Sequence, residues 1–359
     1  MKNAQLTKLR LQQQLISHQP FTAAGDVVHA LGAMQAQDFA GAKWSIALRL
    51  PQATEDDIDD AIAKKQVIRT WALRNTLHFV SPKDVRWMLS LLRDRLLQNA
   101  KSSNKLLGLD EKTLVKGLKV ITNQLEGGNI LTRDELGEAL LQKKLAIDEH
   151  RLSHFLGRAA IDQLICFGPR RGKEFTFALL DEWAPATKPL EREEALATLA
   201  SRYLTSHAPA TIKDFSWWSG LTPTIATEAF ELVKADFSRE TIDGEEYWIP
   251  LTATVSNTGG SIHLLPGFDE YMLGYTNRFH VVDQQHYQKI AGTKNGQFAS
   301  TVVINGKVAG VWKRTMKKNK LQIDVTPFDQ FSPAREKAVT KAAAAYAKYS
   351  KLPLEISVY

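Results

Sequence analysis

The stretch Arg69–His78, RTWALRNTLH, lies at the centre of a strand–turn–strand pattern. Val67–Ala72 and Thr76–Val80 are rich in the β-branched and aromatic residues that favour strands. Leu73–Asn75 joins the two runs, so the segment predicts two paired strands connected by a short turn.

The residues before this hairpin carry helical patterns. Apolar residues from Leu6 to Leu15 follow a helical period, and a second helix is expected over Asp26–Met34. Asp38 is a candidate N-cap for a third helix that reaches Leu50. Thr54–Asp57 opens a fourth with acidic residues at its N-terminus, where they stabilise the helix dipole.

The same order, helices and then a hairpin, recurs twice. The second segment, about 110–180, has an apolar helical stripe, a capping box at Thr132–Glu135 and a cap at Asp148 before strands near 164–167 and 174–178. The third, about 191–250, has helices around 195–206, 211–216 and 222–235. Its hairpin turns at Asp243-Gly244, a pair that favours a two-residue loop.

Helices followed by a hairpin are typical of winged-helix domains. The last hundred residues differ, because strands near 261–266, 298–304, 307–313, 321–325 and 352–358 accompany a helix over Pro333–Tyr349, with a hairpin turn predicted at Asn305-Gly306. The predicted fold class is therefore α+β, with three tandem winged-helix (helix-turn-helix) domains and a small C-terminal α+β domain. The expected division is 1–105, 106–186, 187–252 and 253–359.

The amino-acid composition indicates which classes of protein to expect. The 359 residues carry 46 basic and 39 acidic side chains, a net charge of +7 that favours a polyanionic partner. Cys166 is the only cysteine, so an intramolecular disulfide and a multi-cysteine metal site are excluded within one chain. The N-terminus lacks a signal peptide's apolar core, and no apolar run reaches membrane-spanning length. We expect a cytoplasmic protein without a cofactor.

Gln35-Ala36-Gln37 places two amides two residues apart. In an extended segment the two side chains point to the same side, where they can hold one water molecule. An amide does not titrate usefully, so such a pair suits a reaction whose leaving group is already activated. Taken alone, the pair is more typical of ordinary surface glutamines than of a catalytic site.

Two motifs resemble a known family. Arg69–His78 resembles the Arg-Thr-Trp-x-x-Arg-Gly-Thr-Leu-His motif of the tandem winged-helix family that includes the AlkZ/YcaQ-type DNA glycosylases. This chain has Asn75 in the glycine position, and asparagine tolerates a positive φ better than most residues. Leu264–Arg278, LLPGFDEYMLGYTNR, is similar to that family's Leu-Leu-Pro-x-Phe-Asp-Glu-Tyr block ahead of an arginine. The similarity covers nearly the whole chain.

The resemblance implies a function for the amides. A Gln-x-Gln motif near the N-terminus is the family's catalytic signature, so Gln35 and Gln37 are the expected catalytic residues. The family excises N7- or N3-alkylated purines by hydrolysing the N-glycosidic bond, and some members unhook interstrand crosslinks in base-excision repair. Gln37 is expected to orient the attacking water and Gln35 to help hold the water and sugar. No lysine is identified as a Schiff-base nucleophile, so a monofunctional enzyme is expected.

The expected partner is double-stranded DNA that contains alkylated bases, bound by a monomer in the bacterial cytoplasm and nucleoid. The residues expected to contact DNA are Arg69, Arg74, Arg170, Arg171, Lys173, Arg278, Lys313, Arg314, Lys317 and Lys318. For the basic stretch Lys307–Lys320, a solvated edge that resists aggregation is an equal alternative. For Arg278 the alternative is pairing with Asp269 or Glu270.

Other interpretations stay open. The rival function is a non-catalytic winged-helix DNA-binding or regulatory protein. His150 and His154 have the spacing of a metal pair but lack a third ligand signature, so no metal site is expected. Asp269-Glu270 is assigned to a cap or turn. Trp217-Trp218 is assigned to the core, with a base-stacking platform as the alternative.

Overall fold

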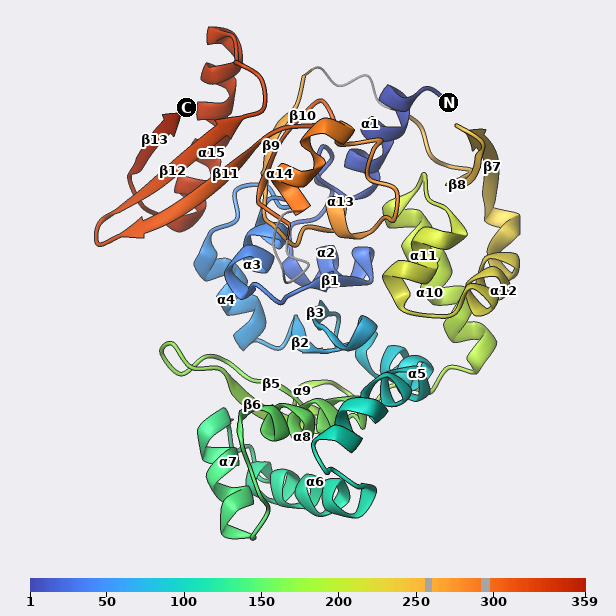
Figure 1. Ribbon diagram of the computed structural model, residues 1–359, viewed down its shortest axis with the longest axis vertical. Coiled ribbons are helices and arrows are strands. Elements are labelled where there is room, and N and C mark those ends of the chain that lie inside the picture. The colour runs from blue at the N-terminus through green and yellow to red at the C-terminus, as the bar shows by residue number, and fades with distance from the viewer. Residues whose placement is uncertain (256–259, 292–297) are drawn as a thin grey trace.

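The computed structural model describes residues 1–255, 260–291 and 298–359 (Figure 1). The predicted α+β class is confirmed, with helices and three sheets in these ranges. The order of helices and hairpins follows the sequence pattern. The number of winged-helix domains stays a prediction.

The largest sheet in the described ranges joins the first two hairpins. Its strand order is β1–β3–β2–β5–β6–β4. The two hairpins meet through one antiparallel pairing of Arg69 with Phe167, so the sheet crosses the predicted boundary at residue 105. Its strands are β1 Ala33–Gln35, β2 Ile68–Trp71, β3 Leu77–Val80, β4 Leu131–Thr132, β5 Ile165–Phe167 and β6 Thr176–Leu179.

The helix before the glutamines is shorter than expected. Gly32 adopts φ 79°, which ends α2 at Leu31, so the prediction that this helix reaches Met34 is wrong. Ala33–Gln35 instead pairs with β3, which places Gln35 on a strand. The helices of this region are α1 Asn3–Gln13, α2 Ala24–Leu31, α3 Phe39–Ala47 and α4 Glu55–Ala63, and the expected Thr54 cap of α4 is present.

A long helix connects the first two segments. α5 spans Val85–Leu106 and was not expected from the sequence. It buries Val85, Met88, Leu92 and Leu96, a spacing that places them on one helical face. α5 packs against α8, α10 and the short 3-10 turn η1, Leu73–Asn75.

The second and third segments confirm the predicted caps and turns. Thr132 and Glu135 form the capping box of α7, and Asp148 caps α8. Asp243 and Gly244 adopt φ 50° and 82°, as a tight hairpin turn requires. The elements are α6 Glu111–Leu125, α7 Arg133–Gln142, α8 Glu149–Ile161, α9 Leu180–Trp183, α10 Arg192–His207, α11 Ile212–Ser219, α12 Pro223–Val233, η2 Lys234–Asp236, β7 Phe237–Ile242 and β8 Glu245–Pro250.

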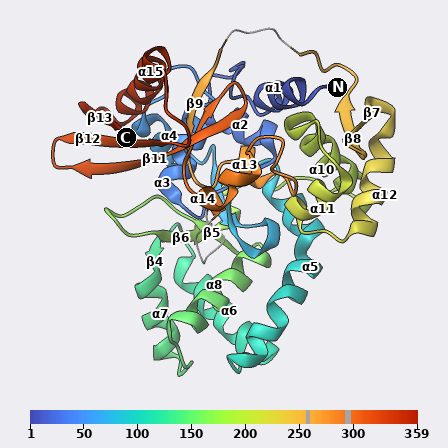
Figure 2. The same ribbon diagram turned by 45° about the horizontal axis from the view of Figure 1, so that its top comes forward.

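The C-terminal sheet has the order β13–β12–β11–β10–β9. β11 continues to Lys317, beyond the predicted end at Lys313, so β11 and β12 form a long hairpin that projects from the body (Figures 1 and 2). The elements are β9 Ile262–Leu265, α13 Glu270–Leu273, η3 Gln284–His286, α14 Tyr287–Ala291, β10 Thr301–Ile304, β11 Lys307–Lys317, β12 Lys320–Pro327, α15 Pro333–Ser350 and β13 Leu354–Val358.

The two ends of the chain share a core. Apolar residues of α2 to α4 pack with residues of β11, β12 and α15 in one cluster, and the indole N–H of Trp44 donates to the carbonyl of Leu264 at 2.7 Å. A second cluster joins Leu11 and Ile16 to Tyr271 and other residues near α13. This packing brings α13 beside β1.

Candidate active site

Both glutamines contact the hairpin predicted from the sequence. Gln35 pairs with His78 across β1 and β3 and is 8% exposed, whereas Gln37 is exposed. Nη2 of Arg74 donates to Oε1 of Gln35 at 3.2 Å, and the N–H of Leu77 donates to Oε1 of Gln37 at 3.2 Å. Each amide orientation is therefore fixed by a donor. Within the described residues, no hydrogen bond uses the Nε2 group of either glutamine.

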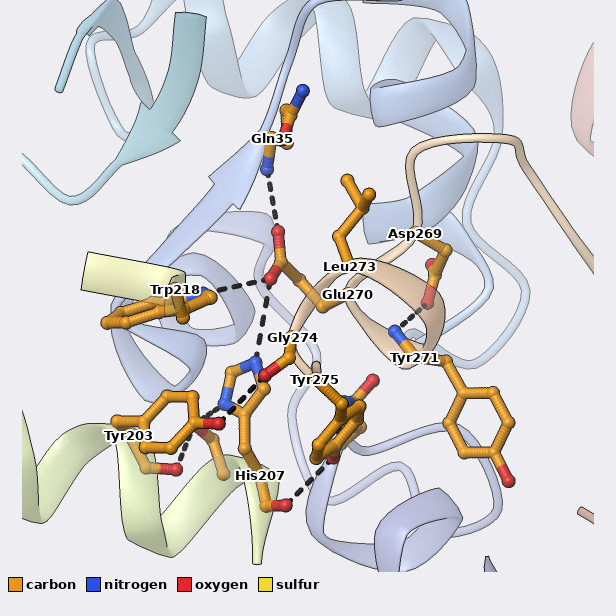
Figure 3. A network of polar contacts seen from close by, with 12 residues as sticks. Gln35, Tyr203, His207, Trp218, Asp269, Glu270, Tyr271, Leu273, Gly274 and Tyr275 are labelled. Carbon is orange, nitrogen blue, oxygen red and sulfur yellow. Dashed lines mark hydrogen bonds and ion pairs between the residues drawn. The ribbon is translucent and has the colours of Figure 1, made fainter. Parts of the chain in front are cut away.

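The buried carboxylate of Glu270, 2% exposed, holds Gln35 from the other side (Figure 3). Its Oε1 accepts the N–H of Gln35 at 2.9 Å, and its Oε2 accepts the indole N–H of Trp218 at 3.0 Å. Nε2 of His207 lies 3.6 Å from Oε2. Burial raises the pKa of Glu270, but His207 and the Gln35 N–H outweigh burial and hold that pKa below its ordinary value.

His207 is itself held in place by α10. Its ring stacks on Tyr203 with centroids 4.6 Å apart, and Nδ1 lies 2.7 Å from Oγ of Ser206. The hydroxyl of Tyr203 donates to the carbonyl of Gly274 at 2.8 Å (Figure 3). The third helical segment therefore fixes both Glu270 and the helix that carries it.

Arg74 connects Gln35 to α11. Arg74 and Asn75 adopt φ 57° and 60°, so the expectation that asparagine accepts the turn is confirmed. The guanidinium donates to the carbonyl of Trp218 and, at 3.4 Å, to that of Trp217. A Cβ on Gly220 would lie 3.2 Å from Cγ of Arg74, so this glycine allows the close approach. Burial lowers the pKa of Arg74.

His78 is fully buried beside this arginine. Nδ1 lies 2.9 Å from the carbonyl of Thr76, and Nε2 has no partner among the described residues. Burial, with the nearby charge of Arg74, lowers the pKa of His78 to about 4. The ring is therefore neutral near pH 7, with Nδ1 donating to Thr76 and a lone pair on Nε2.

Asp269 has a structural environment that differs from that of Glu270. It caps α13, as predicted, and its carboxylate binds Arg49 through two contacts of 2.8 and 2.9 Å. The alternative that Arg278 pairs with Asp269 or Glu270 is wrong. Nε of Arg278 donates to the carbonyl of Met272 at 2.8 Å.

Arg69 lies inside the protein, at 4% exposure. Its Nε and Nη2 donate to the carbonyl of Ala36 at 3.2 and 3.0 Å, and its guanidinium lies 4.5 and 4.3 Å from the rings of Phe167 and Phe175. Burial and the charge of Arg170 lower the pKa of Arg69 to about 10. These contacts hold the backbone between the two glutamines, so the expected DNA contact finds no support in this geometry.

The basic residues of the β5–β6 loop are exposed. Arg170 donates to the carbonyl of Lys173 at 2.6 Å, and its guanidinium lies 5.3 Å from the ring of Phe175. Arg171 pairs with Glu135 at 2.7 Å. The loop therefore presents cations at the surface, as the sequence predicts, and part of that charge is already paired.

The β11–β12 hairpin presents four further predicted contacts. Lys313 and Lys318 are exposed, and Lys317 pairs with Glu355 at 3.3 Å. Arg314 donates to the hydroxyl of Tyr346 and lies 3.9 Å from Asp38. This contact places the middle of the hairpin next to Asp38, the residue that follows Gln37.

The sequence interpretation missed the buried part of the site. It assigned Glu270 to a turn and gave no role to His207 or His78. The one available signal was that Glu270 and His78 both lie in the two family-like motifs. The assignment of Trp217-Trp218 to the core holds for Trp218, which is 0% exposed, but not for Trp217, which is 48% exposed.

The described residues form neither a metal-binding cluster nor a membrane-spanning helix. Within residues 1–255, 260–291 and 298–359, no three His, Cys, Asp or Glu side chains gather closely enough to hold a metal ion. Nδ1 of His154 lies 2.6 Å from Oδ1 of Asn104 instead. Among the helices described, none combines the length and apolar character needed to cross a membrane.

The sequence of this chain is similar to those of known DNA glycosylases. The family model described as DNA glycosylase AlkZ-like matches residues 28–349. An interstrand DNA cross-link repair glycosylase from Streptomyces sahachiroi is 30% identical over 369 residues, which cover 97% of each chain.

A solved structure gives the same result. The structure of the Streptomyces sahachiroi DNA glycosylase AlkZ superposes with a TM-score of 0.81 at 28% identity, covering 99% of each chain. The family match spans both glutamines, the Arg69–His78 hairpin and Glu270. With its fold and sequence both matched over nearly their full length, the chain belongs to the AlkZ-like family of DNA glycosylases, which hydrolyse N-glycosyl bonds.

Proposed function

We propose that this enzyme excises N7- and N3-alkylated purines from duplex DNA, and that it unhooks interstrand crosslinks formed through such bases. The observation that supports this most is the arrangement of Gln35 and Gln37. Both are held by one hairpin, and Glu270 fixes the strand that carries Gln35. The similarity to an interstrand DNA cross-link repair glycosylase from Streptomyces sahachiroi supports the crosslink substrate.

The chemistry matches what amides can do. An N-alkylated purine is cationic and leaves as a neutral base, so little acid catalysis is needed. The transition state resembles an oxocarbenium ion, as in glycoside hydrolysis. Positioning and electrostatic preorganisation then supply most of the rate enhancement.

The two glutamines have different roles in this proposal. Gln37 is exposed, and its Oε1 retains a second lone pair beside the bond from Leu77. It accepts a hydrogen bond from the attacking water and orients it. Gln35 is nearly buried, with its Oε1 bound by Arg74, so its Nε2 group is left to help hold the water and the sugar.

A monofunctional hydrolase is the form we propose. Lys43 is the buried lysine among the residues described, and it forms ion pairs of 2.8 Å with Glu55 and Asp59. A Schiff-base mechanism needs an amine that is free to attack the sugar. Because the Lys43 amine is already engaged in these two ion pairs, we expect base release without strand cleavage.

DNA is proposed to lie between the two basic projections, on a monomeric protein. The β5–β6 loop carries Arg170, Arg171 and Lys173, and the β11–β12 hairpin carries Lys313, Arg314, Lys317 and Lys318. Both project on the same side in two views (Figures 1 and 2). Cations that meet phosphates in this way give affinity without sequence preference.

The test is single-turnover release of 7-methylguanine from a methylated duplex. We expect wild type to release the base and Gln37→Ala to be slower by roughly 10²- to 10³-fold. Gln124→Ala is the matched control, because Gln124 is an exposed glutamine on α6, outside the site. Its rate should equal that of wild type.

A crosslinked duplex is assayed in parallel, and denaturing gels record strand cleavage. No base release by wild type, with DNA binding retained, would instead support the non-catalytic DNA-binding protein. Equal rates for Gln37→Ala and wild type would remove Gln37 from the mechanism.

A further inference from the structure

Trp217 is much more exposed to solvent than the other tryptophans of the chain. The chain has eight, all within the described ranges, and six are 7% exposed or less. Trp71 is half-buried and packs on Phe167. Trp217 is 48% exposed, next to the fully buried Trp218 on α11. About half of this indole is therefore open to solvent and available to a ligand.

The exposed ring is nevertheless held in a fixed position. Its indole N–H donates to the carbonyl of Leu273 at 3.2 Å, which ties it to α13. Leu273 is the last residue of the helix that begins at Glu270, and both appear beside Gln35 in Figure 3. The Trp217 carbonyl accepts from Arg74, whose other nitrogen binds Gln35. The indole of Trp217 is therefore linked to the Gln35 site through α13, and its backbone carbonyl is linked to Gln35 through Arg74.

Two cations flank the same ring. The guanidinium carbons of Arg74 and Arg278 lie 6.0 and 5.9 Å from its centroid. Both guanidiniums are anchored on backbone carbonyls, those of Trp218 and Met272. These cation–π contacts help fix the ring, and a half-exposed aromatic face held in a fixed position is complementary to a base that stacks on it.

We propose that Trp217 is the surface on which the extruded alkylated purine stacks when the lesion leaves the duplex. This inference rests on the proposed function, and it assigns to the site a base-binding residue outside the two motifs. Extrusion costs a few kcal/mol, and stacking on a fixed ring offsets part of that cost. Trp217 thereby selects for a base in the site, while Gln35 and Gln37 act on the sugar and water.

The experiment measures equilibrium binding to two labelled duplexes that cannot react. One contains N7-methylguanine stabilised against cleavage by 2′-fluorination, and the other has a tetrahydrofuran abasic analogue at the same position. We expect Trp217→Ala to weaken binding of the base-containing duplex by about 10- to 100-fold. Binding of the abasic duplex, which has nothing to stack, should stay as in wild type.

Two further variants control for folding. Trp217→Phe keeps an aromatic face without the indole N–H and should restore most of the lost binding, with thermal melting showing that each variant is folded. Leu232→Ala removes a side chain of similar exposure, 42%, from α12 and should bind both duplexes as wild type does.

The outcomes separate this inference from the proposed function. An unchanged preference for the base-containing duplex in Trp217→Ala overturns the stacking site, as does equal weakening of both duplexes. If wild type releases no base but its preference still depends on Trp217, the proposed function fails and the stacking site stands.

Discussion

The site around Gln35 and the hairpin β11–β12 differ in how their charges are held. Near Gln35 the carboxylates of Asp269 and Glu270 are buried and fully engaged by fixed partners. On the hairpin, Lys313 and Lys318 are exposed. Buried charges fix geometry, because an unpaired one is costly, whereas exposed cations supply attraction that salt weakens. Changes in the first region should therefore alter stability or rate, and changes in the second should alter affinity.

The largest expected effect tests the buried side of this comparison. Asp269→Asn leaves Arg49 inside the protein without its counterion, and breaking such a pair costs about 3–5 kcal/mol. Urea denaturation measures the loss. Asp60→Asn removes an exposed pairing with Lys64 and should leave the free energy of unfolding nearly unchanged. Equal effects of the two substitutions would remove the distinction between the regions.

The pH dependence of stability gives the next effect. The pKa of His78 falls to about 4 in the folded protein, below its ordinary 6.5, so the unfolded chain binds a proton that the folded chain excludes. The stabilisation that comes from keeping His78 neutral is fully present above pH 6.5. It is lost as the pH falls toward 4, which lowers the free energy of unfolding by up to about 3 kcal/mol.

His78→Asn should therefore flatten the stability curve between pH 6.5 and 4, as measured by denaturation at several pH values. His263, whose pKa burial also lowers to about 4, keeps a residual slope in that variant. A curve identical to that of wild type would show that His78 is not excluded from protonation.

Glu270→Gln tests whether the buried carboxylate positions Gln35 for the reaction. The amide keeps one acceptor oxygen but loses the charge that binds the N–H of Gln35 and the indole of Trp218. A lost charge-assisted hydrogen bond corresponds to about a 10- to 100-fold slower single-turnover release. Affinity for the duplex should not change, and weaker binding at an unchanged rate would contradict a positioning role.

The smallest expected effect tests the exposed side. Lys318→Ala removes one cation from the hairpin tip, so the slope of log affinity against log salt should fall by about 1. The rate at saturating enzyme should equal that of wild type. Binding titrations from low to moderate salt measure the slope, and an unchanged slope would place Lys318 away from the phosphates.

Local signals predicted much of this fold. The pairs Asp243-Gly244 and Asn305-Gly306 adopt positive φ values, and the capping residues Thr132 and Asp148 hold the expected helices. These features depend on a few neighbouring residues, so the sequence contains them. α5 also had a visible apolar stripe, which the division into three similar segments left unassigned.

The rest depends on contacts between distant residues. The Arg69–Phe167 pairing that joins two hairpins has no local sequence signal. Glu270 and Gln35 are 235 positions apart, so nothing near either residue predicts their hydrogen bond. Trp217 and Trp218 are neighbours on one helix and face different directions, and Trp218 is the buried one because it packs on Tyr203 of α10, a residue distant in sequence.

Gln35 and Glu270 are 235 residues apart in sequence. This separation determines when, during synthesis, the contact between them can form. The ribosome completes Gln35 and Gln37 early, whereas the carboxylate that holds β1 emerges only after most of the chain has been translated. Domains fold in order of emergence, and contacts between distant residues form late. A growing polypeptide thus carries Gln35 and Gln37 for most of translation without the carboxylate that holds β1 in place.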